Sequence, residues 1–89
     1  MIKVYTKNNC MACKITKRKL QELGVNYKEI NVDEDWKGLN YLLERGLTSL
    51  PVVFKDDEPI VTGGFAPNIL ETCVSEEHSK HFSDEKVGN

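Results

Sequence analysis

The first half of the chain contains two kinds of apolar pattern, one typical of strands and one typical of helices. The order in which they follow one another constrains the fold more than any other feature. Residues 2–6 and 27–32 alternate apolar and polar side chains, as half-buried strands do. Between them, residues 11–23 repeat apolar and small side chains at helical spacing before a glycine. A second helical pattern follows three acidic residues and ends at Gly46. A strand–helix–strand succession of this length predicts a right-handed crossover between parallel strands.

The second half of the chain predicts a hairpin and a further helix. Residues 52–55 and 59–61 form two short strands joined by an acidic turn, close enough for antiparallel pairing. Pro67 suits the first turn of a third helix. We therefore expect an α/β domain with the element order β-α-β-α-β-β-α over residues 1–76, followed by a polar, frayed or mobile tail over 77–89.

Cysteine usage points to redox chemistry rather than to structural staples. The chain has 3 cysteines in 89 residues, too few for a framework of several disulfides. It opens with a short polar-interrupted segment unlike a signal peptide and holds no apolar span of about 18 residues, so we expect a cytoplasmic protein outside the membrane. In a reducing compartment, the motif Cys10-Met11-Ala12-Cys13 is more often redox-active or metal-binding than a permanent disulfide.

The position of this motif assigns different roles to its two thiols. Cys10 falls at or beside the N-cap of the first predicted helix, where free backbone N–H groups and the helix dipole favour a thiolate. Cys13 lies one turn further on, on the same face as Leu20, and is expected to be less exposed. We expect Cys10 to attack a substrate disulfide and Cys13 to resolve the mixed disulfide.

A metal site is the alternative reading of these cysteines. Cys73, His78 and His81 could nominally complete a zinc set with Cys10 and Cys13, but no second C-x-x-C motif exists. We predict no metal and no bound cofactor. Cys73 by itself is best explained as a small buried side chain on the third helix.

Charge is distributed unevenly along the chain. Residues 1–30 carry seven Lys/Arg and two Glu, whereas residues 31–89 carry five Lys/Arg and twelve Asp/Glu. The basic excess is either a solvated helix face or a patch that steers an acidic partner. Without interleaved aromatics it argues against nucleic-acid binding. The residues concerned are Lys7, Lys14, Lys17, Arg18 and Lys19.

Three segments resemble the NrdH-redoxins, the glutaredoxin-like hydrogen donors of ribonucleotide reductase in the thioredoxin-fold superfamily. The resemblance covers about residues 2–73 and is most specific over Tyr5 to Lys14, Ser49 to Val52, and Gly64-Phe65 followed by Pro67. It implies a thioredoxin-like fold with a four-stranded mixed sheet flanked by three helices. It also implies a monomer that receives electrons from NADPH through thioredoxin reductase and passes them to ribonucleotide reductase or other disulfide-containing proteins.

The same resemblance implies the surroundings of the redox pair. A cis peptide is expected between Leu50 and Pro51, beside the cysteines, which would free backbone groups of Leu50 to pair with an extended substrate. Tyr5 and Phe65 fit equally well as core residues or as rim groups. The expected substrate-binding residues are Lys7, Met11, Ala12, Leu50, Gly63, Gly64 and Phe65.

The segment from Thr62 to Asn68 separates the possible reductants. Glutathione-dependent glutaredoxins usually place aspartates after the Gly-Gly pair, whereas this chain continues Phe65-Ala66-Pro67-Asn68, so only weak glutathione binding, through Lys7, is expected. The Trp, Ser and Arg that NrdH-redoxins typically carry here are missing. A glutathione-dependent glutaredoxin remains the enzymatic alternative, and a redox-sensing transcriptional regulator is the alternative from another class.

Overall fold

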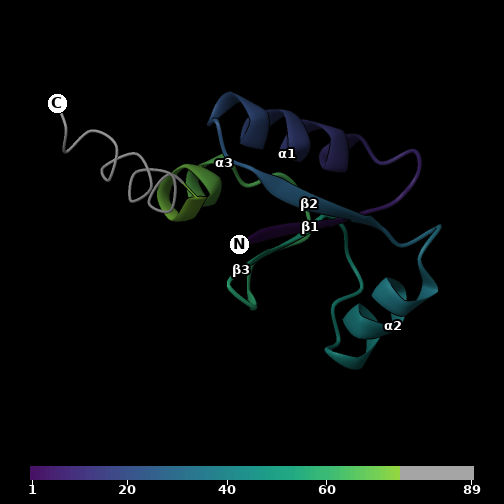
Figure 1. The fold of residues 1–89 in the computed structure, drawn as a ribbon. Coiled ribbons are helices and arrows are strands. Elements are labelled where there is room, and N and C mark those ends of the chain that lie inside the picture. Colours follow the sequence, from purple (N-terminus) through teal and green to yellow (C-terminus); the bar gives the residue numbers. More distant parts are fainter. Residues whose placement is uncertain (75–89) are drawn as a thin grey trace, which may run out of the picture.

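The computed structural model describes residues 1–74, and the order of its elements is the predicted one (Figure 1). The predicted tail at 77–89 and both histidines lie outside this described part. The elements are β1 (Ile2–Thr6), α1 (Met11–Glu22), β2 (Tyr27–Asn31), α2 (Trp36–Glu44), β3 (Val52–Lys55), β4 (Glu58–Thr62), α3 (Pro67–Ile69) and the π-helical turn η1 (Leu70–Val74).

The strands form one mixed sheet in the order β2-β1-β3-β4. β1 runs parallel to β2, as the crossover through α1 predicts, and antiparallel to β3, which in turn pairs with β4 as a hairpin. Tyr5 near the end of β1 lies opposite Val52 at the start of β3, and Val52 lies opposite Thr62 at the end of β4. The segments after β1, before β3 and after β4 therefore meet at one edge of the sheet.

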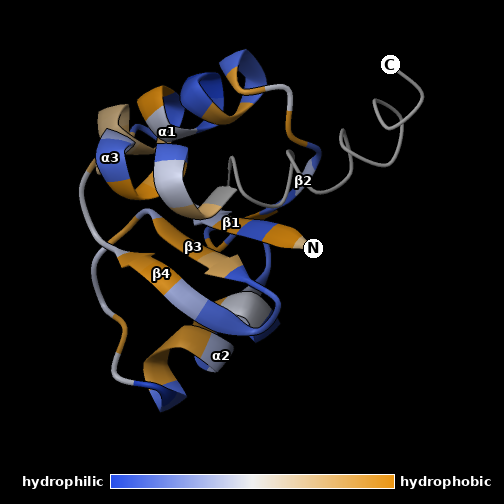
Figure 2. Ribbon diagram, turned by 90° about the vertical axis from the view of Figure 1, so that its left-hand side faces the viewer, coloured by the Kyte–Doolittle hydropathy of each residue, from blue (hydrophilic) through white to orange (hydrophobic). Residues whose placement is uncertain are grey.

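Helices cover both faces of the sheet, with α1 and α3 on one side and α2 on the other (Figure 2). Alternation along the strands sends side chains to two separate cores, because successive residues point to opposite faces. The core under α1 consists of Ile2, Val4, Leu20, Val53, Val61 and Leu70. The core under α2 is richer in aromatic residues and consists of Tyr5, Val32, Leu42, Val52 and Phe54.

Both long helices end in the same hydrogen-bonded motif. Gly24 after α1 and Gly46 after α2 adopt φ values of 72° and 71°, which side chains with a Cβ rarely adopt. In each case the residue after the glycine donates its N–H to the carbonyl five positions back, from Val25 to Leu20 at 3.1 Å and from Leu47 to Leu42 at 2.9 Å. These are Schellman motifs, and they explain why the helices stop at the predicted glycines.

The hairpin and the third helix differ in detail from the sequence prediction. The turn narrows to Asp56 and Asp57, both with positive φ, so β4 extends over residues 58–62 rather than 59–61. The third helix is only one short α-helical turn followed by η1. Cys73 in η1 is partly exposed rather than fully buried, because Leu70 is the residue of this turn that enters the core.

Candidate active site

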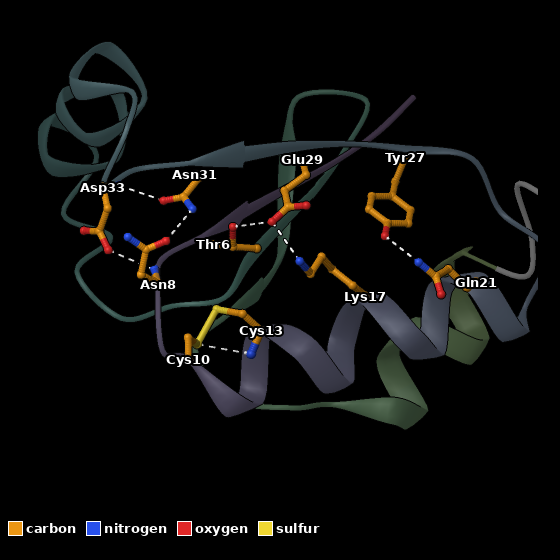
Figure 3. Close-up of polar contacts among 10 residues, drawn as sticks. All are labelled: Thr6, Asn8, Cys10, Cys13, Lys17, Gln21, Tyr27, Glu29, Asn31 and Asp33. Carbon is orange, nitrogen blue, oxygen red and sulfur yellow. Dashed lines mark hydrogen bonds and ion pairs between the residues drawn. A yellow bond between two sulfur atoms is a disulfide. The ribbon is translucent and has the colours of Figure 1, made fainter.

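Cys10 and Cys13 form a disulfide where the loop after β1 enters α1 (Figure 3). Their Cα atoms are 5.2 Å apart, as the spacing of one helical turn predicts. Cys10 keeps 8% of its surface exposed and Cys13 keeps 1%. Cys10 is thus the thiol nearer to solvent, and Cys13 lies against the sheet with Thr16 and Leu20, the other buried residues of α1.

The backbone of Cys10 has the extended conformation of an N-cap, with φ −113° and ψ 106°. Its Sγ accepts the backbone N–H of Cys13 at 3.1 Å, and its carbonyl accepts the N–H of Lys14 at 3.1 Å. No acidic residue occupies the first turn of α1. When the disulfide is open, the positive end of the helix and this N–H group stabilise a negative sulfur at Cys10.

The loop that leads to Cys10 is fastened to the end of β2. The backbone N–H of Asn8 donates to Oδ2 of Asp33 at 2.8 Å, and Nδ2 of Asn31 donates to Oδ1 of Asn8 at 3.0 Å. The N–H of Asp33 donates to Oδ1 of Asn31 at 2.9 Å (Figure 3). From the sequence, residues 7–9 read only as a turn, because their partners lie 23 and 25 residues further along the chain.

A second polar group ties α1 to the sheet. Oε2 of Glu29 accepts a hydrogen bond from Thr6 Oγ1 at 2.8 Å and pairs with Lys17 Nζ at 2.9 Å. Partial burial acts to raise the pKa of Glu29, but the hydrogen bonds from Lys17 and Thr6 outweigh it and leave the pKa below its ordinary value. Lys17 therefore belongs to the basic face of α1 and also links the helix to β2 through Glu29.

The basic face of α1 is partly neutralised. Lys17 pairs with Glu29, and Lys19 Nζ lies 2.6 Å from Glu71 Oε2. The sequence left a solvated helix face and a steering patch as alternatives for the five cations at positions 7, 14 and 17–19. Two of them face carboxylates, which lowers the net positive charge of the group.

Thr16 is an unusual member of the buried face of α1. Its side chain is completely buried, and within residues 1–74 its hydroxyl Oγ1 has no hydrogen-bond partner. A buried hydroxyl without a partner costs about 1–3 kcal/mol. In the sequence, Thr16 is one of the apolar and small residues that repeat at helical spacing over 11–23. That pattern does not indicate that its hydroxyl lacks a hydrogen-bond partner.

The segments before β3 and after β4, which strand register brings to the same edge of the sheet as the segment after β1, contact each other. The peptide between Leu50 and Pro51 is cis, and Pro51 is buried directly before β3. Gly63, after β4, has φ 133°, and a Cβ added there would lie 2.8 Å from Cβ of Ser49. This close approach explains why a glycine occupies position 63.

All of the site residues predicted from the sequence belong to segments that meet at this edge of the sheet. Lys7 precedes Cys10 in its loop and is exposed, and Met11, the first residue of α1, is 68% exposed. Phe65 is 39% exposed and is therefore not a core residue. Tyr5 is instead a core residue, stacked on Tyr41 with ring centroids 5.8 Å apart, and burial raises the pKa of its hydroxyl.

The described residues contain neither a cluster suited to a metal nor a membrane span. Within residues 1–74, no group of three or more His, Cys, Asp or Glu side chains is arranged to hold an ion. In the same part of the chain, no helix is long and apolar enough to cross a bilayer.

Comparison with known proteins shows which family the chain is similar to. The glutaredoxin family model matches residues 2–60. The glutaredoxin-like protein NrdH of Lactococcus lactis subsp. cremoris is 41% identical over 70 residues, covering 79% of this chain and 94% of the relative. NrdH of Escherichia coli is 32% identical over 78 residues, covering 88% of this chain and 94% of the relative.

The fold is also that of a solved relative. The structure of NrdH-redoxin from Escherichia coli superposes with a TM-score of 0.73 at 33% identity, covering 81% of this chain and 92% of that chain. The thioredoxin-like fold predicted from the sequence is confirmed, as is the dithiol chemistry class. With its Cys10–Cys13 pair at the start of α1, the chain belongs to the glutaredoxin family, among the glutaredoxin-like NrdH proteins, and is a thiol–disulfide oxidoreductase.

Proposed function

We propose that this redoxin reduces disulfides in proteins, with Cys10 as the attacking thiol and Cys13 as the resolving thiol, and that it is a hydrogen donor for ribonucleotide reductase. The observation that carries the proposal is the position of the Cys10 sulfur at the N-cap of α1, 3.1 Å from the Cys13 N–H. Of the two thiols, it is the more exposed and the one that the helix N-terminus stabilises as a thiolate.

The reaction transfers two electrons in two exchanges. The Cys10 thiolate attacks one sulfur of the target disulfide, which breaks that bond, and the other target sulfur leaves as a thiolate. Cys13 then loses its proton and its sulfur attacks Cys10 Sγ. The mixed disulfide breaks, the second target sulfur leaves, and the Cys10–Cys13 disulfide remains, so that the target is reduced and the redoxin is oxidised.

The edge around the disulfide supplies a surface for an extended target segment. The Leu50 backbone groups, presented ahead of Pro51, would pair with the target main chain as in strand addition. The exposed side chains of Met11 and Phe65 would offer apolar contact to the target. We propose Lys7, Met11, Ala12, Leu50, Gly63, Gly64 and Phe65 as the residues that contact the target.

Thioredoxin reductase with NADPH is the proposed electron source in the cytoplasm. The NrdH-redoxin of Escherichia coli has a thioredoxin-like activity profile. The four residues after Gly64 carry no carboxylate that could hold the ammonium group of glutathione, although the exposed Lys7 leaves a weak carboxylate contact available.

A reductant assay tests this assignment directly. Purified protein is given a model protein disulfide together with either NADPH and thioredoxin reductase or NADPH, glutathione and glutathione reductase. Turnover in the first mixture is expected. Turnover only in the second would overturn the proposed electron source and favour a glutathione-dependent glutaredoxin.

The separate roles of the two thiols are tested by trapping. Cys13→Ser is expected to accumulate a mixed disulfide between Cys10 and the target, since no resolving thiol is left. Mass spectrometry of the non-reduced complex locates the linkage. A linkage through Cys73, or an equal yield from Cys10→Ser, would contradict the assignment of Cys10 as the attacking thiol.

A further inference from the structure

Three residues form a hydrogen-bonded bridge between the loop that carries Cys10 and the segment after β2. We call Asn8, Asn31 and Asp33 the Asn8 clamp. Its bonds run from the Asn8 amide to Asp33 at 2.8 Å, from the Asn31 side chain to Asn8 at 3.0 Å, and from the Asp33 amide to Asn31 at 2.9 Å. Figure 3 shows the clamp at the end of β1 and β2, on the loop that leads into Cys10.

The clamp holds a loop that makes a turn directly before α1. Asn9, between the clamp and Cys10, has φ 57°, in the left-handed region that asparagine enters more readily than most residues with a Cβ. The turn through Asn9 leads to Cys10 at the N-cap, where its sulfur accepts the N–H of Cys13. Because Asn8 is fixed on one side and α1 on the other, the position of Cys10 depends on both anchors.

The disulfide and the Asn8 clamp both restrain the loop, but the redox reaction changes only the disulfide. In the oxidised protein the disulfide itself ties the loop to α1 through Cys13. Opening the disulfide removes the sulfur–sulfur bond and leaves Cys10 joined to α1 by the peptide bond to Met11 and by the Lys14 N–H on its carbonyl. None of the three bonds of the clamp involves a sulfur atom. The clamp therefore still limits movement of the Asn8 side of the loop when the two sulfurs are no longer bonded.

We propose that Asp33 and Asn31 are positioning residues that hold Cys10 within reach of Cys13 while the disulfide is open, and so speed resolution of the mixed disulfide. This inference rests on the proposed roles of the two thiols. Keeping two reacting groups in place raises their effective concentration and accelerates the intramolecular step. Asp33 contributes most, because it is charged and accepts the backbone N–H of the loop.

Dithionitrobenzoate, a disulfide whose cleavage releases a coloured thiolate, separates the two steps. The Cys10 thiolate attacks one reagent sulfur, the reagent disulfide breaks, and one coloured thiolate leaves while the other half stays bound to Cys10. Cys13 then loses its proton to solvent and attacks Cys10 Sγ. A second coloured thiolate leaves, the protein disulfide forms, and the dithiol has been oxidised as the reagent is reduced.

The test compares Asp33→Ala with Asp35→Ala in stopped-flow kinetics of the reduced protein. All variants carry Cys73→Ser, because the partly exposed thiol of Cys73 would also release coloured thiolate from the reagent. Asp35 is a matched control, because it lies two residues away and also accepts backbone N–H groups, but those of α2. Asp33→Ala is expected to lower the ratio of the second rate to the first by about threefold or more, as expected for losing part of one charged hydrogen bond. Asp35→Ala is expected to leave the ratio unchanged, and Asp33→Asn, which keeps an acceptor oxygen, to restore most of it.

A second measurement is the equilibrium constant for forming the Cys10–Cys13 disulfide in folded protein. A general loss of stability does not change this constant. In a glutathione redox buffer, folded Asp33→Ala is expected to form its disulfide about threefold less favourably than the wild type, and Asp35→Ala equally well. An unchanged ratio of rates in Asp33→Ala, or an equal fall in Asp35→Ala, would overturn the positioning role.

Two further variants keep the test decisive. If Asp33→Ala does not fold, Asn8→Ala carries the comparison: it removes only the side-chain acceptor of Asn31 and is expected to lower the ratio about twofold. An unchanged ratio in that variant would then count against the clamp. In the Cys73→Ser background, Cys13→Ser should show no second release at all, and a second release there would refute the proposed thiol roles independently of the clamp.

Discussion

The two long helices end alike but begin differently. Both stop in a Schellman motif built on a glycine with φ near 70°. At the start of α2, Asp35 is the N-cap, and its Oδ1 accepts the N–H groups of Lys37 and Gly38 at 3.1 Å. At the start of α1 the equivalent position is Cys10, whose sulfur accepts one N–H.

The third residue of each helix extends this contrast. In α2 it is Gly38, which lets the helix lie close to the sheet, since an added Cβ would stand 2.7 Å from Cγ2 of Ile30. In α1 it is Cys13, which fills the corresponding buried position with a second sulfur. The same N-cap geometry thus has two uses. In α2 the carboxylate of Asp35 caps the helix and stabilises it, whereas in α1 the cap is Cys10, whose disulfide bond to Cys13 can open and close.

The largest expected effect comes from replacing the cap of α1. Cys10→Ser and Cys10→Ala are both expected to lose disulfide reductase activity by at least about a thousandfold, because the nucleophile is gone. The two variants should differ in stability, since serine caps a helix and alanine does not, by about 1 kcal/mol in urea unfolding. Equal stability would mean that the cap at Cys10 contributes nothing to α1.

Replacing the cap of α2 should have the opposite profile. Asp35→Ala is expected to lower the free energy of unfolding by about 1–2 kcal/mol, because two backbone N–H groups lose their acceptor. Reductase activity of the folded protein should stay at the wild-type level. A large loss of activity in fully folded Asp35→Ala protein would show that the N-cap of α2 also affects the redox pair at the start of α1. The separation of roles between the two helix starts would then be wrong.

The close packing at the start of α2 can be tested with Gly38→Ala. Alanine has the better helix propensity, by about 1 kcal/mol, but its Cβ would force Ile30 to move, at a typical cost of about 1–3 kcal/mol. We expect a net destabilisation of about 1 kcal/mol in thermal or urea unfolding. A more stable variant would indicate that Ile30 yields easily and that the glycine is not required for packing.

The smallest effect concerns the ion pair that joins α1 to β2. Because the pKa of Glu29 is lowered in the folded protein, its contribution to stability is present above the unfolded value of about 4.3 and is lost as the pH falls through the folded pKa. Wild type should therefore exceed Glu29→Gln in stability at pH 7, and the difference should shrink below about pH 4. Urea unfolding of both proteins across this range measures it, and a constant difference would exclude the ionised carboxylate as its source.

Much of the fold followed from local patterns. The alternation of residues 2–6 and 27–32, with a helical pattern between them, predicted the parallel pair, and the glycines at 24 and 46 predicted where the helices end. These features depend on neighbouring residues, and a short stretch of chain is enough to express them. The π-helical end of the third helix and the two-residue turn at Asp56 and Asp57 were not foreseen, because such details depend on packing.

The candidate site also has features that local sequence predicts and features that depend on contacts between distant segments. Local sequence was enough to predict the redox pair, since Cys10 and Cys13 lie one helical turn apart after a strand and need no distant partner to form their ring. Other features became visible only in the folded chain: Asp33 and Asn31 on the Cys10 loop, Ser49 against Gly63, and the unsatisfied hydroxyl of Thr16. Contacts between segments 14 or more residues apart depend on strand register and on the packing of helices against the sheet, which no local pattern of residues encodes.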